Sequence, residues 1–470
     1  MEDNMTKAID VLYIHPTKNL NSTLFSFMPV GAVGLLNKLK DAGFSVYGIN
    51  YGVERCLDPS YDLLKELSCL SYKALLLDLH WYEHAFGAIE IARLSKKIYP
   101  NVPVMIGGLT TTIYAKEILK AFDVIDYALK GDSEQPICDL AKFLTRQEGS
   151  PDTIQNIAYR KDEKVIDKPI TYCCDDIDAV DNVSDSFLKH NDLYMYANTG
   201  GIDLKRKKSV WITVGRGCLY NCSYCDCASR NTSFLWGRDK MFVRSAESVA
   251  KDIIRAHEKG ADVVRLTHDL EMFGKPYYEK IFNIIKDSGI KIGFNYDAFQ
   301  LPSTYFVDLL DNTFDMVMID LTLLSANEKI RKSMGKNFTN DALYALLDHM
   351  EGSGIIQRVY YSVNVDGETK EEMRETFNQI KYLLKRYQNP DFFVCYQKVV
   401  LEPLAGLRKK ERLKIKPTLN TFMDYYKYCT LENVGDIGYT DASSDLYQEK
   451  MDAYQKIKEA YKAMGFNNIY

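Results

Sequence analysis

Three cysteines lie within eight residues of this chain, in the sequence CLYNCSYC at positions 218–225. A loop this short can point three thiolates at one centre, and thiolates are the ligands that iron–sulfur clusters use. Since most such clusters take four cysteines, three leave one iron open to a substrate. The preceding residues 210–214 (VWITV) predict a strand and residues 215–217 a turn. The cysteines therefore follow the end of a strand, where open α/β folds bind their ligands.

The octet resembles the signature of the radical S-adenosylmethionine (SAM) superfamily in its C-x3-C-x2-C spacing, in the preceding Arg-Gly and in the aromatic Tyr224 before the last cysteine. The resemblance implies that Cys218, Cys222 and Cys225 hold a [4Fe–4S] cluster. Its open iron chelates SAM, and an electron cleaves SAM to a 5′-deoxyadenosyl radical. The resemblance also places Tyr224 among the cofactor-binding residues and implies an electron donor such as flavodoxin or ferredoxin.

A structural zinc site is the alternative for this loop, with Cys227 as a fourth thiolate. Zinc sites usually draw on two separated pairs of ligands, and no second pair lies nearby in the sequence. The sequence therefore favours the cluster. Cys227 then remains a spare thiol, a redox partner or a core cysteine.

Composition limits the class of protein and its partners. With 470 residues the chain is too long for one ordinary core, so two or three domains are expected. A net charge of −5 argues against a nucleic acid as the main partner. The first residues are acidic and polar where a signal peptide would be basic, and the longest near-apolar run, residues 25–36, is too short to span a bilayer. We expect a cytoplasmic protein without a membrane span.

Residues 1–145 alternate short apolar segments with amphipathic ones. Strands separated by helices indicate a doubly wound parallel sheet of the Rossmann or flavodoxin type, which binds its ligand at the carboxyl ends of the strands. The predicted strands cover residues 10–14, 45–50, 73–78, 102–106 and 124–129.

Two of these strand ends carry residues suited to a large, flat ligand. His80 and Trp81 follow the third strand, whereas Gly107, Gly108 and Thr110 follow the fourth. Paired glycines let the backbone approach such a ligand closely. Strand order, loop chemistry and position before the cysteine octet resemble the cobalamin-binding domain of B12-dependent radical SAM enzymes. The resemblance implies that these five residues border cobalamin.

One element of many cobalamin proteins has no match here. The Asp-x-His-x-x-Gly motif that supplies an axial histidine follows the first strand, where this chain reads IHPTKN at residues 14–19. We therefore expect the loop after the third strand, rather than this motif, to cover the lower face of cobalamin. His80 and His84 are equally consistent with ordinary hydrogen-bonded histidines at a strand–helix junction. No Walker A or Gly-x-Gly-x-x-Gly sequence indicates another nucleotide.

After residue 145 the chain predicts three further regions. Residues 146–205 form a connector with a possible hairpin at 159–165, and residues 408–470 form a helical cap. Between them, residues 206–407 contain six strand–helix units, which predict a partial (β/α)6 barrel with its reactive groups at the carboxyl ends of the strands. The predicted strands cover residues 210–214, 263–267, 291–296, 316–321, 357–365 and 392–401.

Polar residues end two of the barrel strands. Asp269 follows the second strand, where the resemblance implies an acceptor for the SAM amino group, although the Gly-Gly-Glu motif itself is degenerate here. Asn295 and Asp297 end the third strand and are candidates for contact with the SAM ribose or the substrate. Each residue alone is equally consistent with a helix cap or a turn. We consider them together as candidate ligands because all three lie at strand ends.

Together the two resemblances imply a class B radical SAM methyltransferase-like enzyme. The adenosyl radical removes hydrogen from an unactivated carbon, and methylcobalamin then donates a methyl group. Two alternatives remain. One is a radical SAM cyclase or rearrangement enzyme whose N-terminal domain transfers no methyl group or binds no cobalamin. The other is a non-catalytic sensor or carrier of a cluster or corrinoid. The charge balance and the tyrosine-rich tail fit a small-molecule, lipid or peptide substrate.

Overall fold

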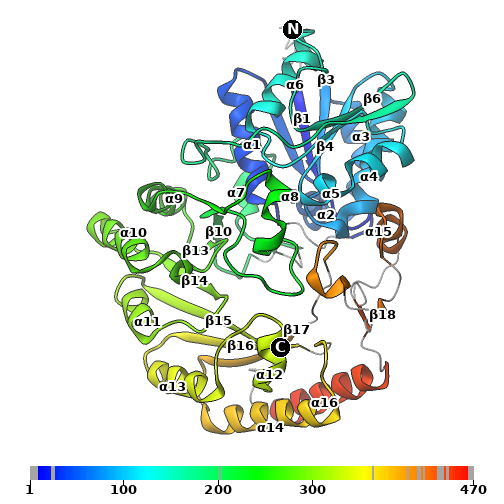
Figure 1. The fold of residues 1–470 in the computed structure, drawn as a ribbon. Helices are drawn as coiled ribbons and strands as arrows, with labels where there is room; N and C mark the ends of the chain where they lie inside the picture. Colours follow the sequence, from blue (N-terminus) through cyan, green and yellow to red (C-terminus); the bar gives the residue numbers. More distant parts are fainter. Residues whose placement is uncertain are drawn as a thin grey trace. The chain divides into compact units, whose positions relative to one another are not determined.

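The computed structural model describes most of the chain, and this part divides into two compact units (Figure 1). The described residues are 9–22, 27–198, 201–202, 204–362, 365–397, 399, 402–409, 414–415, 419–430, 439–440 and 444–463. The first unit comprises Met1–Lys208, Thr232–Lys240 and Leu419–Val434, and the second comprises Ser209–Asn231, Met241–Thr418 and Gly435–Tyr470. The domain boundaries at residues 145, 205 and 407 stay predictions.

The first unit is built on one seven-stranded sheet, in the order β2-β1-β3-β4-β5-β6-β7. The five parallel strands expected from the sequence are confirmed, and the hairpin that the sequence placed in the connector extends the same sheet in antiparallel fashion. The strands are β1 (Ile9–His15), β2 (Val46–Asn50), β3 (Tyr72–Asp78), β4 (Val104–Gly107), β5 (Tyr127–Leu129), β6 (Ile157–Lys161) and β7 (Lys164–Asp167).

Helices cover both faces of this sheet (Figure 1). α1 (Val30–Asp41) and α6 (Glu134–Arg146) pack together and share one apolar core with the strands beneath them. α3 (Leu63–Ser68), α4 (Ala85–Ile98) and α5 (Leu109–Ala121) lie on the opposite face. Strands covered on both faces are apolar along their whole length rather than at alternate positions, which is why residues 74–79 read as a continuous buried run.

The strand order reverses between β1 and β3. From β1 the chain runs outward to β2 and then returns to pair β3 on the other side of β1, with Ile14 opposite Leu77. The connecting loops therefore leave the two neighbouring strand ends in opposite directions. Such a switch point is where open α/β sheets bind ligands. The last residues of these two strands are His15 and Asp78.

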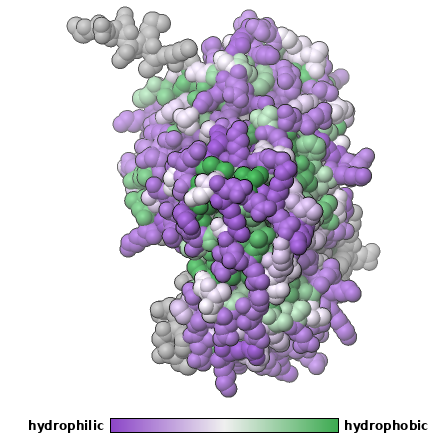
Figure 2. Space-filling view, turned by 90° about the vertical axis from the view of Figure 1, so that its left-hand side faces the viewer, coloured by the Kyte–Doolittle hydropathy of each residue, from purple (hydrophilic) through white to green (hydrophobic). Residues whose placement is uncertain are grey.

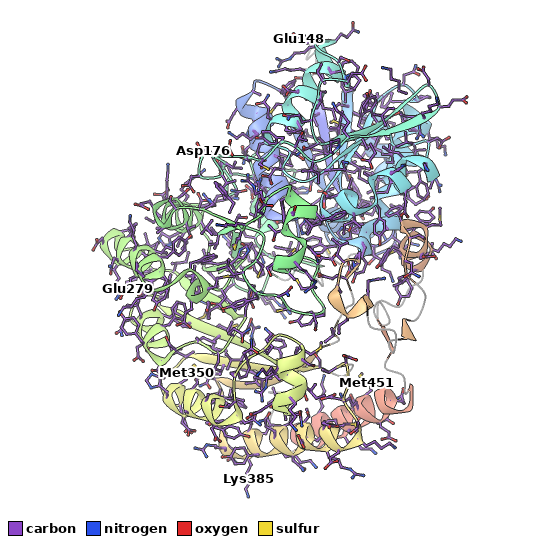
Figure 3. All side chains as sticks on the ribbon, viewed as in Figure 1. Glu148, Asp176, Glu279, Met350, Lys385 and Met451 are labelled. Carbon is purple, nitrogen blue, oxygen red and sulfur yellow. The ribbon has the colours of Figure 1, made fainter. Side chains whose placement is uncertain are left out.

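The second unit confirms the partial barrel, with six parallel strands in the order β10-β13-β14-β15-β16-β17. Helices line one side of these strands, and Lys385 on the last of them projects away from the sheet (Figures 1 and 3). The strands are β10 (Ser209–Ile212), β13 (Val263–Leu266), β14 (Gly293–Ala298), β15 (Met316–Leu324), β16 (Ile356–Ser362) and β17 (Phe392–Gln397), and the helices are α9 (Ala246–Glu258), α10 (Lys275–Ser288), α11 (Thr304–Asp311), α13 (Asn340–Met350) and α14 (Lys370–Arg386).

Two helices of the C-terminal region belong to different units. α15 (Phe422–Cys429) lies in the first unit against α4 and α5, and its buried Tyr425 ring packs on Tyr82 and Tyr114. α16 (Ser444–Ala463) lies in the second unit and packs against α14. Tyrosines of α15 are thus core residues of the first unit. A covering role of the tail over the barrel stays a prediction.

The surface shows no large apolar area on the face drawn in Figure 2, where hydrophilic side chains surround small apolar patches. Within the described part of the chain, every helix is too short or too polar to cross a lipid bilayer.

Close packing of α4 on the loop after β1 generates a stability prediction. A Cβ atom on Gly87 would lie 1.9 Å from the carbonyl oxygen of Thr17, and that backbone cannot move aside cheaply because the Gly87 N–H donates to Lys18 O at 3.1 Å. We expect Gly87→Ala to lower the free energy of unfolding by about 3 kcal/mol or more. Urea denaturation of the full chain measures it.

Gly31 is the matched control, because it is also helical, lies on the exposed face of α1 and has no atom within 4 Å of the position that a Cβ atom would take. Gly31→Ala should stabilise the protein by up to about 1 kcal/mol, the helix-propensity difference. Equal effects of the two substitutions would contradict the proposed clash at α4.

Candidate functional site

The cysteine loop follows the end of β10, as the sequence predicts. The chain passes from β10 through β11 (Gly215–Arg216), which pairs with β12 (Phe242–Val243), and enters the loop at Gly217 with φ +87°. Within the loop the N–H of Tyr220 donates to Cys218 Sγ at 3.4 Å, and the N–H of Ser229 donates to Tyr220 O at 2.9 Å. These bonds fold the octet back on itself.

The thiols of Cys218, Cys222 and Cys225 lie close enough in this loop for their charges to interact. Burial raises the pKa of the Cys218 thiol to about 11, and the nearby Cys225 and Cys222 contribute to the shift. Burial also raises the pKa of Cys222. The pKa of Cys225 lies well above its usual range, mainly because its thiol is hydrogen-bonded to Cys227 and, in addition, because it is buried. Burial therefore disfavours the thiolate forms, and a metal that binds them must displace the thiol protons.

A buried cation lies beside the thiols. Lys336 is 4% exposed, and its ammonium donates to the carbonyl oxygen of Phe299 at 2.7 Å. Burial lowers the pKa of Lys336, and the charges of Cys222, Asp269, Cys225 and Cys218 oppose that shift. An ammonium at this position would offset the negative charge that three thiolates bring to a cluster.

Arg230 braces the loop from its C-terminal side. Its guanidinium donates to Asn221 Oδ1 at 2.7 Å, to Cys222 O at 3.0 Å and to Cys225 O at 2.9 Å. Five fixed donors make a guanidinium suited to holding several carbonyls in one geometry. Arg230 thus fixes the backbone of two of the three predicted ligands.

Gly335 makes room for this loop from the neighbouring chain segment. It has φ +99°, and a Cβ atom there would lie 3.0 Å from Cys222 Cα and 3.4 Å from Cys222 Sγ. Tyr224, predicted to bind cofactor, packs against a buried apolar cluster that includes Leu324 and Met334. The cofactor contact of Tyr224 stays a prediction, and its ring anchors the loop to the barrel.

Two acids interact beside the cysteines, Asp226 directly after the octet and Glu402 after β17. Glu402 accepts a hydrogen bond from the backbone N–H of Asp226, and Asp226 Oδ1 accepts from the N–H of Leu404 at 2.5 Å. Burial raises the pKa of Asp226 to about 8, and the nearby Glu402 adds to the shift. The pair ties the cysteine loop to the segment after β17.

Asp269, the predicted acceptor for the SAM amino group, lies near the loop but is heavily engaged. It caps the 3₁₀ turn Leu270–Phe273 through the N–H of Glu271 at 3.0 Å, and it also accepts from the N–H of Phe299 at 3.0 Å and from the hydroxyl of Tyr296. Burial raises its pKa. The structure gives Asp269 a structural role as a cap, and its contact with SAM stays a prediction.

Asn295 and Asp297 join a charged network rather than standing alone. Arg265 Nη2 lies 3.1 Å from Asp297 Oδ1, and Arg358 Nη2 donates to Asn295 Oδ1 at 3.0 Å. Asp320 accepts from Asn295 Nδ2 at 3.0 Å and pairs with both arginines. Burial raises the pKa of Asp297 to about 7, although Arg265 opposes the shift. These residues line four neighbouring strands of the barrel.

In the first unit, the structure brings the five predicted cobalamin-binding residues together. The N–H of Leu79 donates to Gly107 O at 2.6 Å, and the hydroxyl of Thr110 donates to His80 O at 3.0 Å. Gly108 has φ +114°, and a Cβ atom there would lie 2.7 Å from the carbonyl oxygen of Leu79. The glycine is thus required by the close approach of the two loops.

The side chains at this edge present an aromatic, half-buried surface. Trp81 lies with its ring centroid 4.8 Å from that of His80 and 5.6 Å from that of Phe27. Burial lowers the pKa of His80 to about 4, so its imidazole is neutral at physiological pH. Neutral rings and bare glycine backbone at strand ends fit a large, flat, largely apolar ligand such as a corrin.

Sequence analysis missed Lys336 and Arg230. Arg230 lies eight positions after Cys222, and its charge near the octet was the available signal. Lys336 follows α12 (Glu328–Ser333), more than a hundred residues from the cysteines, so nothing local in the sequence indicates its position. The donor set as a whole, three cysteines in one loop with Lys336 and Arg230 beside them, fits a cluster.

Comparisons with known families agree with this geometry. The family model of the radical SAM superfamily matches residues 212–380, and that of the B12 binding domain matches residues 17–141. The first match implies a [4Fe–4S] cluster and SAM as cofactors, and the second implies cobalamin.

Curated relatives are distant. The anaerobic magnesium-protoporphyrin IX monomethyl ester cyclase of Rubrivivax gelatinosus is 22% identical over 313 residues, which are 65% of this chain and 53% of that protein. An uncharacterised methyltransferase of Pyrococcus horikoshii is 21% identical over 350 residues, 74% of this chain and 71% of that protein. This chain spans about half the length of the cyclase.

A solved structure shares the whole fold. The radical SAM methyltransferase TsrM of Kitasatospora setae, solved with cobalamin and a [4Fe-4S] cluster bound, superposes with a TM-score of 0.68 at 14% identity. The match covers 98% of this chain and 90% of TsrM. It establishes the common arrangement of strands and helices.

The brace on the cysteine loop can be tested by substitution. Arg230→Ala removes the hydrogen bonds to Asn221 Oδ1, Cys222 O and Cys225 O, so we expect fewer irons per chain after anaerobic reconstitution and faster loss of the visible absorption to a chelator. Arg230→Lys keeps the positive charge but loses the planar, two-pronged guanidinium, so its iron content should lie between those of the wild type and Arg230→Ala. Arg386→Ala, at an exposed pair with Asp348, is the control and should retain wild-type iron. Wild-type iron content in Arg230→Ala would show that the brace is dispensable.

Proposed function

Because this chain is a radical SAM enzyme that also carries a B12-binding domain, we propose that it uses SAM and cobalamin together to methylate an unactivated carbon. The observation that carries the proposal is the loop of three cysteines that Arg230 braces, in a chain whose other unit ends its β3 and β4 strands in a glycine-rich, aromatic edge. When bound, a cluster with an open iron would supply the electron that converts SAM to an adenosyl radical, and cobalamin would carry the methyl group to be transferred.

The chain's own residues hold and tune these groups. Cys218, Cys222 and Cys225 would ligate the iron, and Arg230 keeps two of their backbone carbonyls in place. The ammonium of Lys336 would stabilise the negatively charged thiolate form of the site. His80 and Trp81 would contact cobalamin as neutral, half-buried rings.

The charged layer of the barrel supports a polar small molecule as the substrate. Arg265 lies over the Trp211 ring at 4.5 Å and pairs with Asp297, whose side chain remains 28% exposed. Partial exposure on barrel strands leaves the layer accessible to a ligand with polar or charged groups.

Flavodoxin or ferredoxin is proposed as the electron donor.

The names of the relatives support methylation and one alternative. TsrM and the Pyrococcus horikoshii protein are methyltransferases by name, whereas the Rubrivivax gelatinosus protein is a cyclase. A second cyclase of that type, from Synechocystis sp., is 26% identical over 250 residues. Radical ring formation is therefore the second candidate function, with the same cysteine loop and without methyl transfer.

Products of SAM distinguish the two functions before a substrate is known. Methylation consumes SAM in two ways, so the anaerobically reconstituted chain with cobalamin, SAM and reduced flavodoxin as the electron donor should form S-adenosylhomocysteine as well as 5′-deoxyadenosine. Ring formation yields 5′-deoxyadenosine without S-adenosylhomocysteine. We expect Cys222→Ala to lose 5′-deoxyadenosine formation at least a hundredfold, about 2.7 kcal/mol, because one iron ligand is missing. Liquid chromatography with mass detection measures both products.

The control for this assay is Arg386→Ala, which should form both products at the wild-type rate. Zinc in place of iron after reconstitution would exclude radical chemistry. 5′-Deoxyadenosine without S-adenosylhomocysteine, with cobalamin present, would replace methylation by the second candidate.

Cobalamin binding at the β3 edge has its own test. Trp81→Leu removes the ring that contacts His80 and Phe27, so we expect the dissociation constant for hydroxocobalamin to rise about tenfold. Equilibrium dialysis with absorbance detection measures it. Trp236→Phe, in α8 (Thr232–Trp236) of the same unit, should bind as the wild type does. Unchanged binding in Trp81→Leu would remove this residue from the cobalamin site.

A further inference from the structure

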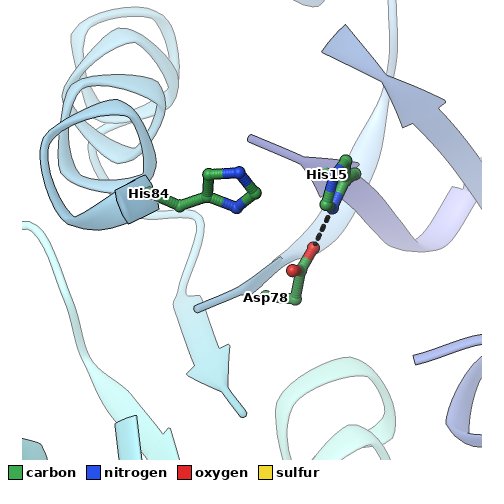
Figure 4. Close-up of side chains that lie close together, drawn as sticks. All are labelled: His15, Asp78 and His84. Carbon is green, nitrogen blue, oxygen red and sulfur yellow. Dashed lines mark hydrogen bonds and ion pairs between the residues drawn. The ribbon is translucent and has the colours of Figure 1, made fainter. Parts of the chain in front are cut away.

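A second cluster of potential metal ligands lies in the first unit, far from the cysteine loop in the sequence. It consists of His15 at the end of β1, Asp78 at the end of β3 and His84 in the short 3₁₀ helix η1 (Tyr82–His84) (Figure 4). These three residues meet at the switch point between β1 and β3, where a sheet of this topology binds ligands. All three are buried, with exposures of 0%, 6% and 0%.

The three side chains converge closely enough to share one ion. One ligand atom from each lies within 4.8 Å of the other two, and His15 Nδ1 is 2.9 Å from Asp78 Oδ1. The rings of His15 and His84 meet edge to face, with centroids 5.1 Å apart. Two ligand atoms bound to one divalent ion, each by a bond of about 2.1 Å, lie about 3.0–3.4 Å apart. The ligand atoms of His15, Asp78 and His84 would therefore have to approach one another by less than about 2 Å.

The carboxylate is oriented and still has capacity for a ligand. Asp78 Oδ1 accepts a hydrogen bond from the hydroxyl of Tyr13 at 2.7 Å in addition to its contact with His15. Its other oxygen, Oδ2, is buried and has no hydrogen-bond partner among the residues that the structure describes. A buried acceptor without a partner costs about 1–3 kcal/mol. A cation between the three residues would satisfy it.

We propose that His15, Asp78 and His84 bind a divalent transition-metal ion, Zn²⁺ or Fe²⁺, separate from the iron of the cysteine loop. Two imidazoles and one carboxylate suit these borderline ions, whereas Mg²⁺ and Ca²⁺ take oxygen ligands. Tyr13 acts as the positioning residue that fixes the carboxylate, as hydrogen-bonding partners of metal ligands do. The site neither uses nor requires the cobalamin and methyl transfer proposed above.

The competing structural interpretation is a hydrogen-bonded His15–Asp78 pair with His84 packed beside it. Another pair in the same unit provides a matched control for this interpretation. His190 Nδ1 lies 2.7 Å from Glu54 Oε1, its side chain is 41% exposed, and no third metal ligand converges on the pair within the described part of the chain. An imidazole–carboxylate pair alone should not hold an ion at low concentration.

The test uses the full chain with Cys218, Cys222 and Cys225 replaced by alanine, prepared without cobalamin, so that neither the thiolates of the cysteine loop nor corrin cobalt contribute. Anaerobic titration with Co²⁺ should give about one bound ion per chain, with ligand-field bands in the visible and no sulfur charge-transfer band, and Zn²⁺ should displace it. His84→Ala should weaken binding at least a hundredfold, Asp78→Asn likewise, and Tyr13→Phe about tenfold. His190→Ala should leave binding unchanged.

Folding of the variants is checked by circular dichroism, and the metal-dependent rise in melting temperature gives a second readout. If the chain without Cys218, Cys222 and Cys225 does not fold, the same titration is made on the wild type, where bands without sulfur charge transfer report the histidine site. The proposal is overturned if the folded parent binds no Co²⁺ beyond the cysteines, or if His84→Ala and Asp78→Asn both bind it as the parent does. Neither result would alter the proposed SAM chemistry.

Discussion

Both units depend on the carboxyl ends of their parallel strands, because the strand faces that helices cover are apolar and exclude polar groups. The interior residues of β1 and β3 are buried and apolar, and their backbone groups bond to the neighbouring strands. Reactive side chains therefore gather beyond the carboxyl ends. The cysteine loop follows β10, Asp269 follows β13, and His80 follows β3. One rule of sheet architecture thus places the candidate ligands for each cofactor.

Burial at these edges has an electrostatic consequence. The thiols of Cys218 and Cys222 have raised pKa values because burial disfavours the charged form. Positive charge from a bound metal is therefore needed to stabilise their thiolates. The cations beside them are bonded to backbone carbonyls, Lys336 to Phe299 and Arg230 to the loop itself. They are held in place before any ligand arrives, which lowers the cost of assembling a charged centre in a buried site.

The sequence predicted the strands of both sheets, because continuous apolar runs between helices are a local signal, and the spacing of the octet identified the three cysteines. It could not predict interactions between distant segments. Lys336 reaches the cysteine loop, and Arg265 and Arg358 pair with Asp320, only through the folded barrel. His15 lies where the Asp-x-His-x-x-Gly motif would occur, but the residues around it do not match that motif. Its hydrogen-bonding partner, Asp78, lies 63 residues further along the chain. A motif search along the chain cannot find a pair assembled from two strands.

The segment from Asp78 to His84 joins the two sites of the first unit. Its half-buried residues, His80 and Trp81, face the edge where we propose that cobalamin binds, and its buried residues belong to the cluster with His15. An ion held by Asp78 and His84 would restrain both ends of this short segment. Restraint before binding reduces the entropy that a ligand must otherwise overcome in ordering a loop. The two sites would then be coupled, with an ion in the cluster raising the affinity for cobalamin and cobalamin raising the affinity for the ion.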